Sequence, residues 1–217
     1  MHATRWKLAC FDLDGTLVRH ISTGEHVATK LGHADAMSEI GRAYAAGAVT
    51  NADVAAVDGG HYRGLTRADV SRMLDDIPVI DDIAETVEWL RARGISSAVC
   101  TLAWRFVGEV FVERYGFIAS SGPTLRIGRN GKFTGEVESD FTEHDKPAFV
   151  GSLCSTLGIG MHEVFHVGDS RSDIPLFEAV GYSVALNASR QARETARVAL
   201  EADSLLDILR VIPGLRS

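Results

Sequence analysis

The sequence predicts an α/β fold, namely a Rossmann-like parallel sheet with helices on both faces, a small helical cap inserted after strand 1, and a β-hairpin excursion. Three observations support this. Short apolar strands alternate with amphipathic helices after residue 78, helix-favouring stretches fill residues 19–78, and Asn130-Gly131 separates two alternating stretches. The length of 217 residues suits one core with a small appended element, so we expect a core of residues 1–18 and 79–217 and a cap of residues 19–78.

The first element is an apolar strand over residues 6–12, which ends at Asp12-Leu13-Asp14-Gly15-Thr16. Gly15 supplies the flexible point at which the chain can turn away. The sequence that follows is rich in Ala and favours helices. We expect four helical segments, separated by Gly and Thr-Asn, over residues 26–31, 34–46, 51–57 and 67–74. The glycine-rich stretch 59–64 is expected to be the most flexible loop of this cap.

The remainder alternates between helices and strands, which indicates a parallel sheet. We expect helices over residues 83–90, 104–115, 147–157, 174–179, 191–200 and 204–211, strands over 95–101, 164–167 and 182–186, and a hairpin over 124–137. Ligands of such sheets bind beyond the carboxyl ends of the strands. Asp12, Thr101 and Asp169 all fall at such ends.

Charge and composition exclude several classes of protein. The net charge is −7, the sequence pI is near 5.6, and no basic run occurs, so nucleic acid is not an expected partner. No signal-peptide pattern and no apolar run of roughly 18 to 20 residues occurs, so we expect no membrane association and a cytoplasmic location.

Cysteine and histidine spacing argues against a zinc site or a disulfide framework. The three cysteines lack CxxC spacing and are expected to be small buried hydrophobic residues; they are Cys10, Cys100 and Cys154. Four of the histidines show neither HxH nor HExxH spacing and are interpreted as solvated or locally bonded; they are His20, His26, His33 and His61.

Four short motifs, taken in order, resemble those of the haloacid dehalogenase superfamily. Each motif alone has an ordinary structural explanation, as an acidic turn, a helix cap or a solvated charge. Their order and placement carry the resemblance. The motifs are Phe11-Asp12-Leu13-Asp14-Gly15-Thr16-Leu17, Ala98-Val99-Cys100-Thr101, Lys146-Pro147 and Gly168-Asp169-Ser170-Arg171-Ser172-Asp173.

The resemblance implies a phosphoric monoester hydrolase in which Asp12 attacks phosphorus and becomes transiently phosphorylated. Asp14 would serve as general acid and base. Thr101 and Lys146 would bind the phosphoryl oxygens and spread the charge that develops in the transition state.

The same resemblance implies Mg²⁺ as the cofactor, because a carboxylate and a phosphate dianion repel each other and this ion prefers oxygen ligands. Its expected site comprises Asp12, Asp169, the backbone carbonyl of Asp14, and Asp173 as a residue that orients the metal site or its waters. The second Asp of the first motif separates the chain from the dehalogenase branch of the superfamily.

The cap, the hairpin with Lys132-Phe133-Thr134-Gly135-Glu136-Val137, and residues 180–188 resemble the phosphoserine phosphatase branch. A small phosphorylated substrate is therefore expected, with phosphoserine as the best single guess. The positions that the branch uses for the substrate ammonium and carboxylate carry Ile21 and Asp58 here. If phosphoserine is the substrate, Glu25 and Arg63 must take over these two contacts.

The second and fourth motifs also depart from the branch, with Thr101-Leu102-Ala103 in place of Ser-Gly-Gly and Ser172 in place of Asn. Two alternatives stay open at this point. One is a phosphotransferase or mutase that passes the phosphoryl group from Asp12 to an organic acceptor. The other is a non-catalytic binding domain on the same scaffold.

Overall fold

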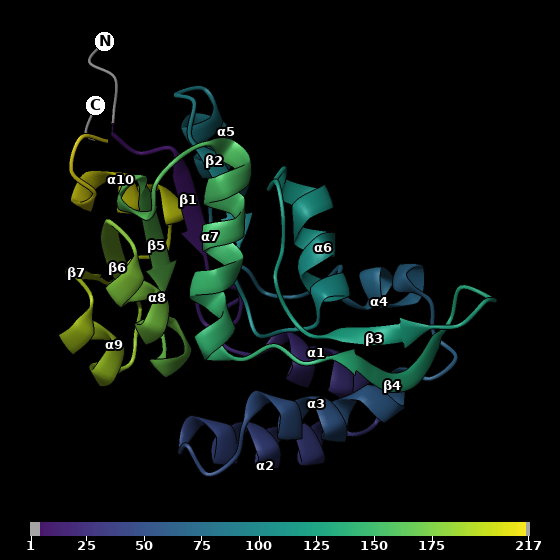
Figure 1. Cartoon of the computed structure of the whole chain (residues 1–217). Helices are drawn as coiled ribbons and strands as arrows, with labels where there is room; N and C mark the ends of the chain where they lie inside the picture. The colour runs from purple at the N-terminus through teal and green to yellow at the C-terminus, as the bar shows by residue number, and fades with distance from the viewer. Residues whose placement is uncertain (1–4, 216–217) are drawn as a thin grey trace.

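The computed structural model describes residues 5–215 and contains a five-stranded sheet in the order β2-β1-β5-β6-β7 (Figure 1). Every neighbouring pair of strands is parallel, so all carboxyl ends lie at one edge. This arrangement confirms the expected fold class. The strands are β1 (Leu8–Phe11), β2 (Ser96–Val99), β5 (Val164–Gly168), β6 (Tyr182–Leu186) and β7 (Val198–Leu200).

Helices cover both faces of the sheet because the strands are apolar on both sides. In β1, Leu8 and Cys10 pack in one buried cluster with Val150 of α7, whereas Ala9 and Phe11 pack in the opposite and larger cluster. The helices of the core are α5 (Ile83–Arg91), α6 (Arg105–Tyr115), α7 (Lys146–Leu157), α8 (Ile174–Ala179), α9 (Arg190–Thr195) and α10 (Ile208–Val211).

Four helices between β1 and α5 form the element that we call the cap. Three of them begin at a capping box, in which Ser22, Thr50 or Thr66 exchanges hydrogen bonds with the acidic residue three positions later. Figure 1 shows α1, α2 and α3 beyond the carboxyl edge of the sheet. The cap helices are α1 (Thr23–Leu31), α2 (Ala34–Ala45), α3 (Asn51–Gly59) and α4 (Arg67–Met73). The exact division into core and cap stays a prediction.

The expected hairpin forms from β3 (Thr124–Ile127) and β4 (Phe133–Ser139), which lie beside α3 (Figure 1). In its connection only Gly131 takes left-handed angles, with φ of 74°. The Asn130 side chain instead accepts a hydrogen bond from the Lys132 backbone N–H at 3.2 Å. The dipeptide therefore turns the chain through its glycine, with the asparagine as a side-chain acceptor.

The helix expected over residues 191–200 is wrong in its second half. Helix α9 ends at Thr195, and the following Val198–Leu200 forms the edge strand β7 beside β6. Ala196 is already extended, and Leu200 accepts a hydrogen bond from the Asn187 backbone N–H at 2.8 Å. Pairing with an open sheet edge, which is a long-range effect, thus overrides the local helix preference.

Two further expectations concern burial and membrane association. All three cysteines are free and buried, as the sequence predicts. Within residues 5–215, no helix has both the length and the apolar character that crossing a bilayer requires.

Candidate active site

Asp12 follows β1 directly, at the carboxyl edge of the sheet between β2 and β5. Its backbone N–H donates to the Val167 carbonyl at 2.9 Å, which continues the pairing with β5 and fixes the start of the loop. Gly15 then turns the chain with φ of 87°, and a Cβ at this position would overlap the Asp169 carboxylate. Asp169 follows β5 immediately, so neighbouring strands bring Asp12 and Asp169 together.

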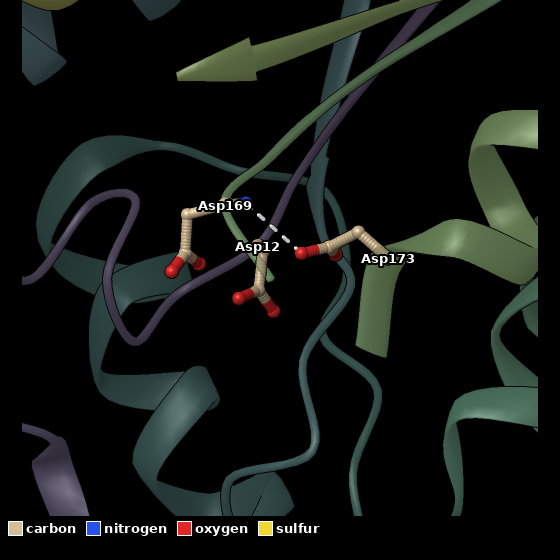
Figure 2. A group of neighbouring side chains, drawn as sticks. All are labelled: Asp12, Asp169 and Asp173. Carbon is tan, nitrogen blue, oxygen red and sulfur yellow. Dashed lines mark hydrogen bonds between the residues drawn. The ribbon is translucent and has the colours of Figure 1, made fainter. Parts of the chain in front are cut away.

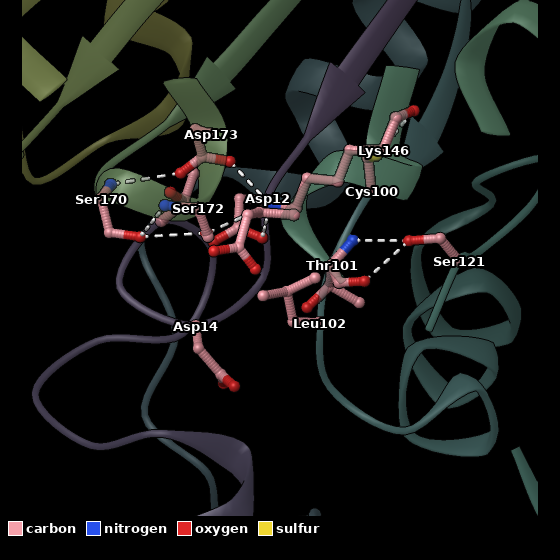
Figure 3. A network of polar contacts seen from close by, with 12 residues as sticks. Asp12, Asp14, Cys100, Thr101, Leu102, Ser121, Lys146, Ser170, Ser172 and Asp173 are labelled. Carbon is pink, nitrogen blue, oxygen red and sulfur yellow. Dashed lines mark hydrogen bonds and ion pairs between the residues drawn. The ribbon is translucent and has the colours of Figure 1, made fainter. Parts of the chain in front are cut away.

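Lys146 begins helix α7 and is completely buried beneath the loop of Asp12. Its Nζ lies 3.0 Å from Asp12 Oδ1, 2.8 Å from Asp173 Oδ1 and 3.4 Å from Ser172 Oγ. Burial alone would lower the pKa of Lys146, but the negative charges of Asp12 and Asp173 outweigh it and raise that pKa. The ammonium therefore stays charged next to Asp12 (Figure 3).

Asp173 is buried, and all of its close contacts come from hydrogen-bond donors. One oxygen accepts from Lys146 and from His166 Nε2, both at 2.8 Å. The other accepts from the backbone N–H groups of Asp169 at 3.0 Å and Ser170 at 3.1 Å. Burial raises the pKa of Asp173, but the charge of Lys146 and the hydrogen bond from His166 together outweigh burial. The pKa of Asp173 is therefore below its usual range. Asp173 thus holds Lys146 and the loop of Asp169 in place, and its expected role in orienting the metal site or its waters stays a prediction.

His166 is a residue of this network that the sequence reasoning missed. It lies within β5 and is fully buried, with Nδ1 at 3.1 Å from the Cys10 carbonyl oxygen and Nε2 at Asp173. Because both ring nitrogens face acceptors, the ring ties the neighbouring strand β1 to the Asp173 loop. The one sequence signal is a polar residue in an otherwise apolar buried strand, Val164-Phe165-His166-Val167.

Asp12, Asp169 and Asp173 place carboxylate oxygens within 4.8 Å of one another (Figure 2). Burial, followed by the charge of Asp173, raises the pKa of Asp12 to about 7. Burial, followed by the charge of Asp12, raises the pKa of Asp169 to about 8. Lys146 alone does not balance three clustered carboxylates, so the site fits a further cation with oxygen ligands. The carboxylate oxygens that remain for it are Asp12 Oδ2 and those of Asp169, and the backbone carbonyl of Asp14 stays a predicted ligand.

Asp14 lies two residues along the same loop, but its carboxylate points away from that of Asp12 (Figure 3). It accepts from the Thr23 backbone N–H at 2.6 Å and from the Thr23 hydroxyl at 3.1 Å, at the start of cap helix α1. Burial raises the pKa of Asp14 to about 6, although the bonds from Thr23 oppose the rise. Asp14 can therefore exchange a proton near neutral pH, where Asp173 cannot.

Thr101 lies two residues beyond β2 and is buried at the same edge. Its hydroxyl accepts from the Ala103 backbone N–H at 3.1 Å. Ser121 holds the Thr101 backbone in both directions, accepting from its N–H and donating to its carbonyl at 2.8 Å each (Figure 3). Ser121 is a second residue that sequence reasoning missed, because the loop after α6 gives no motif signal.

A cavity of about 400 Å³ opens from Asp12, Asp14 and Thr101 towards the cap. Glu25 lines it, but its carboxylate is engaged in the capping box, accepting from the Ser22 backbone N–H at 3.2 Å and hydroxyl at 3.0 Å. Arg63 does not line this cavity. It lies instead in a separate depression beside the hairpin, and its contact with a substrate carboxylate stays a prediction.

The sheet order, the paired aspartates after β1, the buried lysine and the acid after β5 agree with a hydrolase of the haloacid dehalogenase superfamily. A family model described as haloacid dehalogenase-like hydrolase matches residues 9–178. The chain belongs to that family.

Curated relatives point to one branch. The chain is 26% identical to a phosphoserine phosphatase of Methanocaldococcus jannaschii over 95% of this chain and 97% of that protein. It is 23% identical to a phosphoserine phosphatase of Campylobacter jejuni subsp. doylei over 95% and 99%.

A solved structure of a phosphoserine phosphatase is also similar to this chain. A phospho-aspartyl intermediate analogue of phosphoserine phosphatase superposes with a TM-score of 0.83 at 25% identity, covering 96% of this chain and all of that one. The family match and the names of these relatives agree with the enzyme class expected from the sequence, a phosphoric monoester hydrolase.

Proposed function

We propose that this protein hydrolyses a small phosphomonoester, with Asp12 as the nucleophile, Mg²⁺ as the cofactor and an aspartyl phosphate as the intermediate. The observation that carries the proposal is the buried Lys146 ammonium, 3.0 Å from Asp12 and 2.8 Å from Asp173, beside an acidic cluster open to a cavity. A carboxylate held by one buried cation, with room for a second, is suited to attack on a phosphate dianion.

In the first step, an oxygen of Asp12 forms a bond to phosphorus and the bond from phosphorus to the ester oxygen breaks. The leaving alkoxide takes a proton from the protonated form of Asp14, whose pKa of about 6 makes this form available near neutral pH. The Thr101 hydroxyl and Lys146 stabilise the phosphoryl oxygens. Bound Mg²⁺ would neutralise charge between phosphate and the carboxylates of Asp12 and Asp169.

In the second step, water attacks the phosphorus of the aspartyl phosphate and gives a proton to Asp14. The bond from phosphorus to the Asp12 oxygen breaks, which releases inorganic phosphate and regenerates both carboxyl groups in their starting states. Water as the acceptor distinguishes this reaction from transfer to an organic acceptor. The names of the relatives make phosphoserine the reference substrate for testing.

The proposal predicts that Asp12→Asn loses at least a thousandfold in kcat with p-nitrophenyl phosphate, because an amide is a poor nucleophile and a poor metal ligand. Phosphate release from the donor alone, with and without Mg²⁺ after exhaustive chelation, measures hydrolysis and the metal requirement. Mass spectrometry of the wild-type protein quenched during turnover locates the phosphoryl group. Full turnover without metal, or a phosphoryl group on another residue, would overturn the assignment.

A further inference from the structure

Asp58 is a buried acid of the cap helix α3 that lines the same cavity as Asp12 and Asp14. Its Oδ1 accepts from His33 Nε2 at 2.8 Å and its Oδ2 accepts from Trp104 Nε1 at 2.7 Å. The first donor belongs to the cap and the second to the core loop that follows β2. Each oxygen thus has one donor, and each keeps a further lone pair.

His33 is the cap-side partner of Asp58, and only one of its two ring nitrogens has a hydrogen-bond partner among the described residues. The ring is buried, and its Nδ1 has no partner among the described residues. An imidazolium would leave an unsatisfied N–H at Nδ1, whereas the neutral ring with its proton on Nε2 leaves none. The ring also stacks on His61 with centroids 3.7 Å apart, a contact that two cations would oppose.

Tyr62 supplies a second polar group in this part of the cavity. The side chain is fully buried and lines the cavity, and its hydroxyl is close enough to Asp58 to feel that carboxylate, although it makes no hydrogen bond of standard geometry among the described residues. Burial, followed by the charge of Asp58, raises the pKa of Tyr62, so the hydroxyl keeps its proton. A buried hydroxyl in this position is available to bond a polar group of a ligand in the cavity.

The rest of the lining consists of apolar side chains, neutral polar side chains and charged side chains that are mostly acidic. Its acids are Asp12, Asp14, Glu25 and Asp58, and its one basic side chain is the exposed Arg42, which donates to Ser38 Oγ at 2.8 Å. Apolar side chains form the walls around Asp58; they include Met37, Val54, Ala55, Trp104 and Val107. A substrate carboxylate in this part of the cavity would lose its water and face Asp58 without a buried cation.

We propose that this cavity selects phosphomonoesters whose alcohol carries a hydrogen-bond donor, an ammonium above all, and no carboxylate, with Asp58 as the specificity-determining residue. The inference rests on the proposed function and names the substrate class of the same site. Asp58 accepts from the donor of the alcohol, Tyr62 bonds the same polar end, and the apolar walls enclose its carbon chain.

A purely structural role for Asp58 makes a different prediction. Asn51, seven residues earlier on α3, donates to the Leu102 carbonyl at 3.1 Å and the Phe141 carbonyl at 2.8 Å, which also ties the cap to the core. If Asp58 only joins the cap to the core through its hydrogen bond with Trp104, replacing it lowers the activity on all esters by the same factor. If it selects the alcohol, its loss changes the ratio between esters.

O-Phosphoethanolamine and O-phosphoserine form a matched pair of probes, because they differ only by the carboxylate. We expect the wild-type protein with Mg²⁺ to show a kcat/KM at least tenfold higher for phosphoethanolamine. Asp58→Asn should reduce this ratio at least fivefold, chiefly through KM. Glu39→Gln removes the same charge from an exposed position of the cap outside the cavity lining and should leave the ratio unchanged.

Binding separates this inference from the proposed function. Calorimetric titration of Asp12→Asn with each ester in the presence of Mg²⁺ gives the same preference without any turnover. If neither ester nor p-nitrophenyl phosphate is hydrolysed, the proposed function fails while the binding preference still tests the inference. Equal or tighter binding of phosphoserine by this variant overturns the inference, as does an Asp58→Asn that slows both esters by the same factor. Should Asp58→Asn fail to fold, the wild-type ratio decides.

Discussion

At the scale of single residues, the candidate site depends on groups that never need to touch a substrate. Asp173 is held by four donors, and His166 provides one of them while its other nitrogen bonds the Cys10 carbonyl. Because a carboxylate in this setting is fixed, Lys146 is fixed with it, at 3.0 Å from Asp12. The position of the candidate nucleophile therefore depends on a histidine beneath the sheet edge.

We expect His166→Gln to lower the free energy of unfolding by about 1–3 kcal/mol. The reason is that either the Cys10 carbonyl or the Asp173 carboxylate, both buried, loses a hydrogen-bond donor. The kcat for p-nitrophenyl phosphate should fall as Lys146 and Asp173 shift. Urea unfolding and steady-state kinetics measure both effects. The exposed His144→Gln is the control and should stay within about 0.5 kcal/mol of the wild type. Wild-type values for both quantities in His166→Gln would contradict this account.

At the scale of elements, the loop after β1 is shaped by its contact with the loop after β5. Gly15 takes left-handed angles directly against the Asp169 carboxylate, and the Thr16 hydroxyl lies 3.3 Å from the same carboxylate. The close approach puts the acids of two different strands in one cluster. A side chain at residue 15 would therefore move Asp169 in addition to straining the backbone.

Gly15→Ala is expected to lose at least a hundredfold in kcat/KM and to require more Mg²⁺ for half-maximal activity, since the methyl group displaces Asp169. Gly32→Ala is the matched control. Gly32 has φ of 83°, close to that of Gly15, but no atom lies within 4 Å of the added Cβ. Both variants should lose about 1 kcal/mol of stability from the backbone strain. Similar activity in the two would show that strain alone, and no displacement of Asp169, affects the site.

At the scale of the whole molecule, the acidic cluster links stability to pH and to cations. The pKa values of Asp12 and Asp169, about 7 and 8 in the folded protein, lie above the usual value of 3.8. Without a cation, the folded state therefore binds protons more tightly than the unfolded chain, and these two groups lower stability as pH rises from about 4 to 8. Asp173, with a lowered pKa, contributes in the opposite sense and loses its contribution as pH falls below about 4.

A cation that binds these carboxylates competes with the protons, so its effect should grow with pH. We expect the rise in Tm on adding 5 mM Mg²⁺ to be larger at pH 8 than at pH 6, measured by scanning fluorimetry. Asp169→Asn should remove most of the difference between the two pH values. The same Tm rise at both pH values would show that Mg²⁺ does not bind at this cluster.

The sequence by itself determined the α/β class, the helical insertion, and the residues Asp12, Thr101 and Asp169 at one sheet edge. These features are local: strands and helices follow from periodicity, and the parallel sheet brings the carboxyl ends of its strands together. The superfamily was also recognisable, because its motifs are short and contiguous. The structure places Lys146 Nζ 3.0 Å from Asp12 Oδ1, while its expected role in binding phosphate stays a prediction.

Only the tertiary structure decided the partners of these residues. The fold places Arg63 beside the hairpin, while Asp58 lines the cavity from the inward side of α3. His166 and Ser121 carry no motif, and β7 forms only because β6 offers an open edge. Each of these outcomes depends on contacts between segments distant in sequence, whose geometry is set by packing of the whole chain and not by local preference.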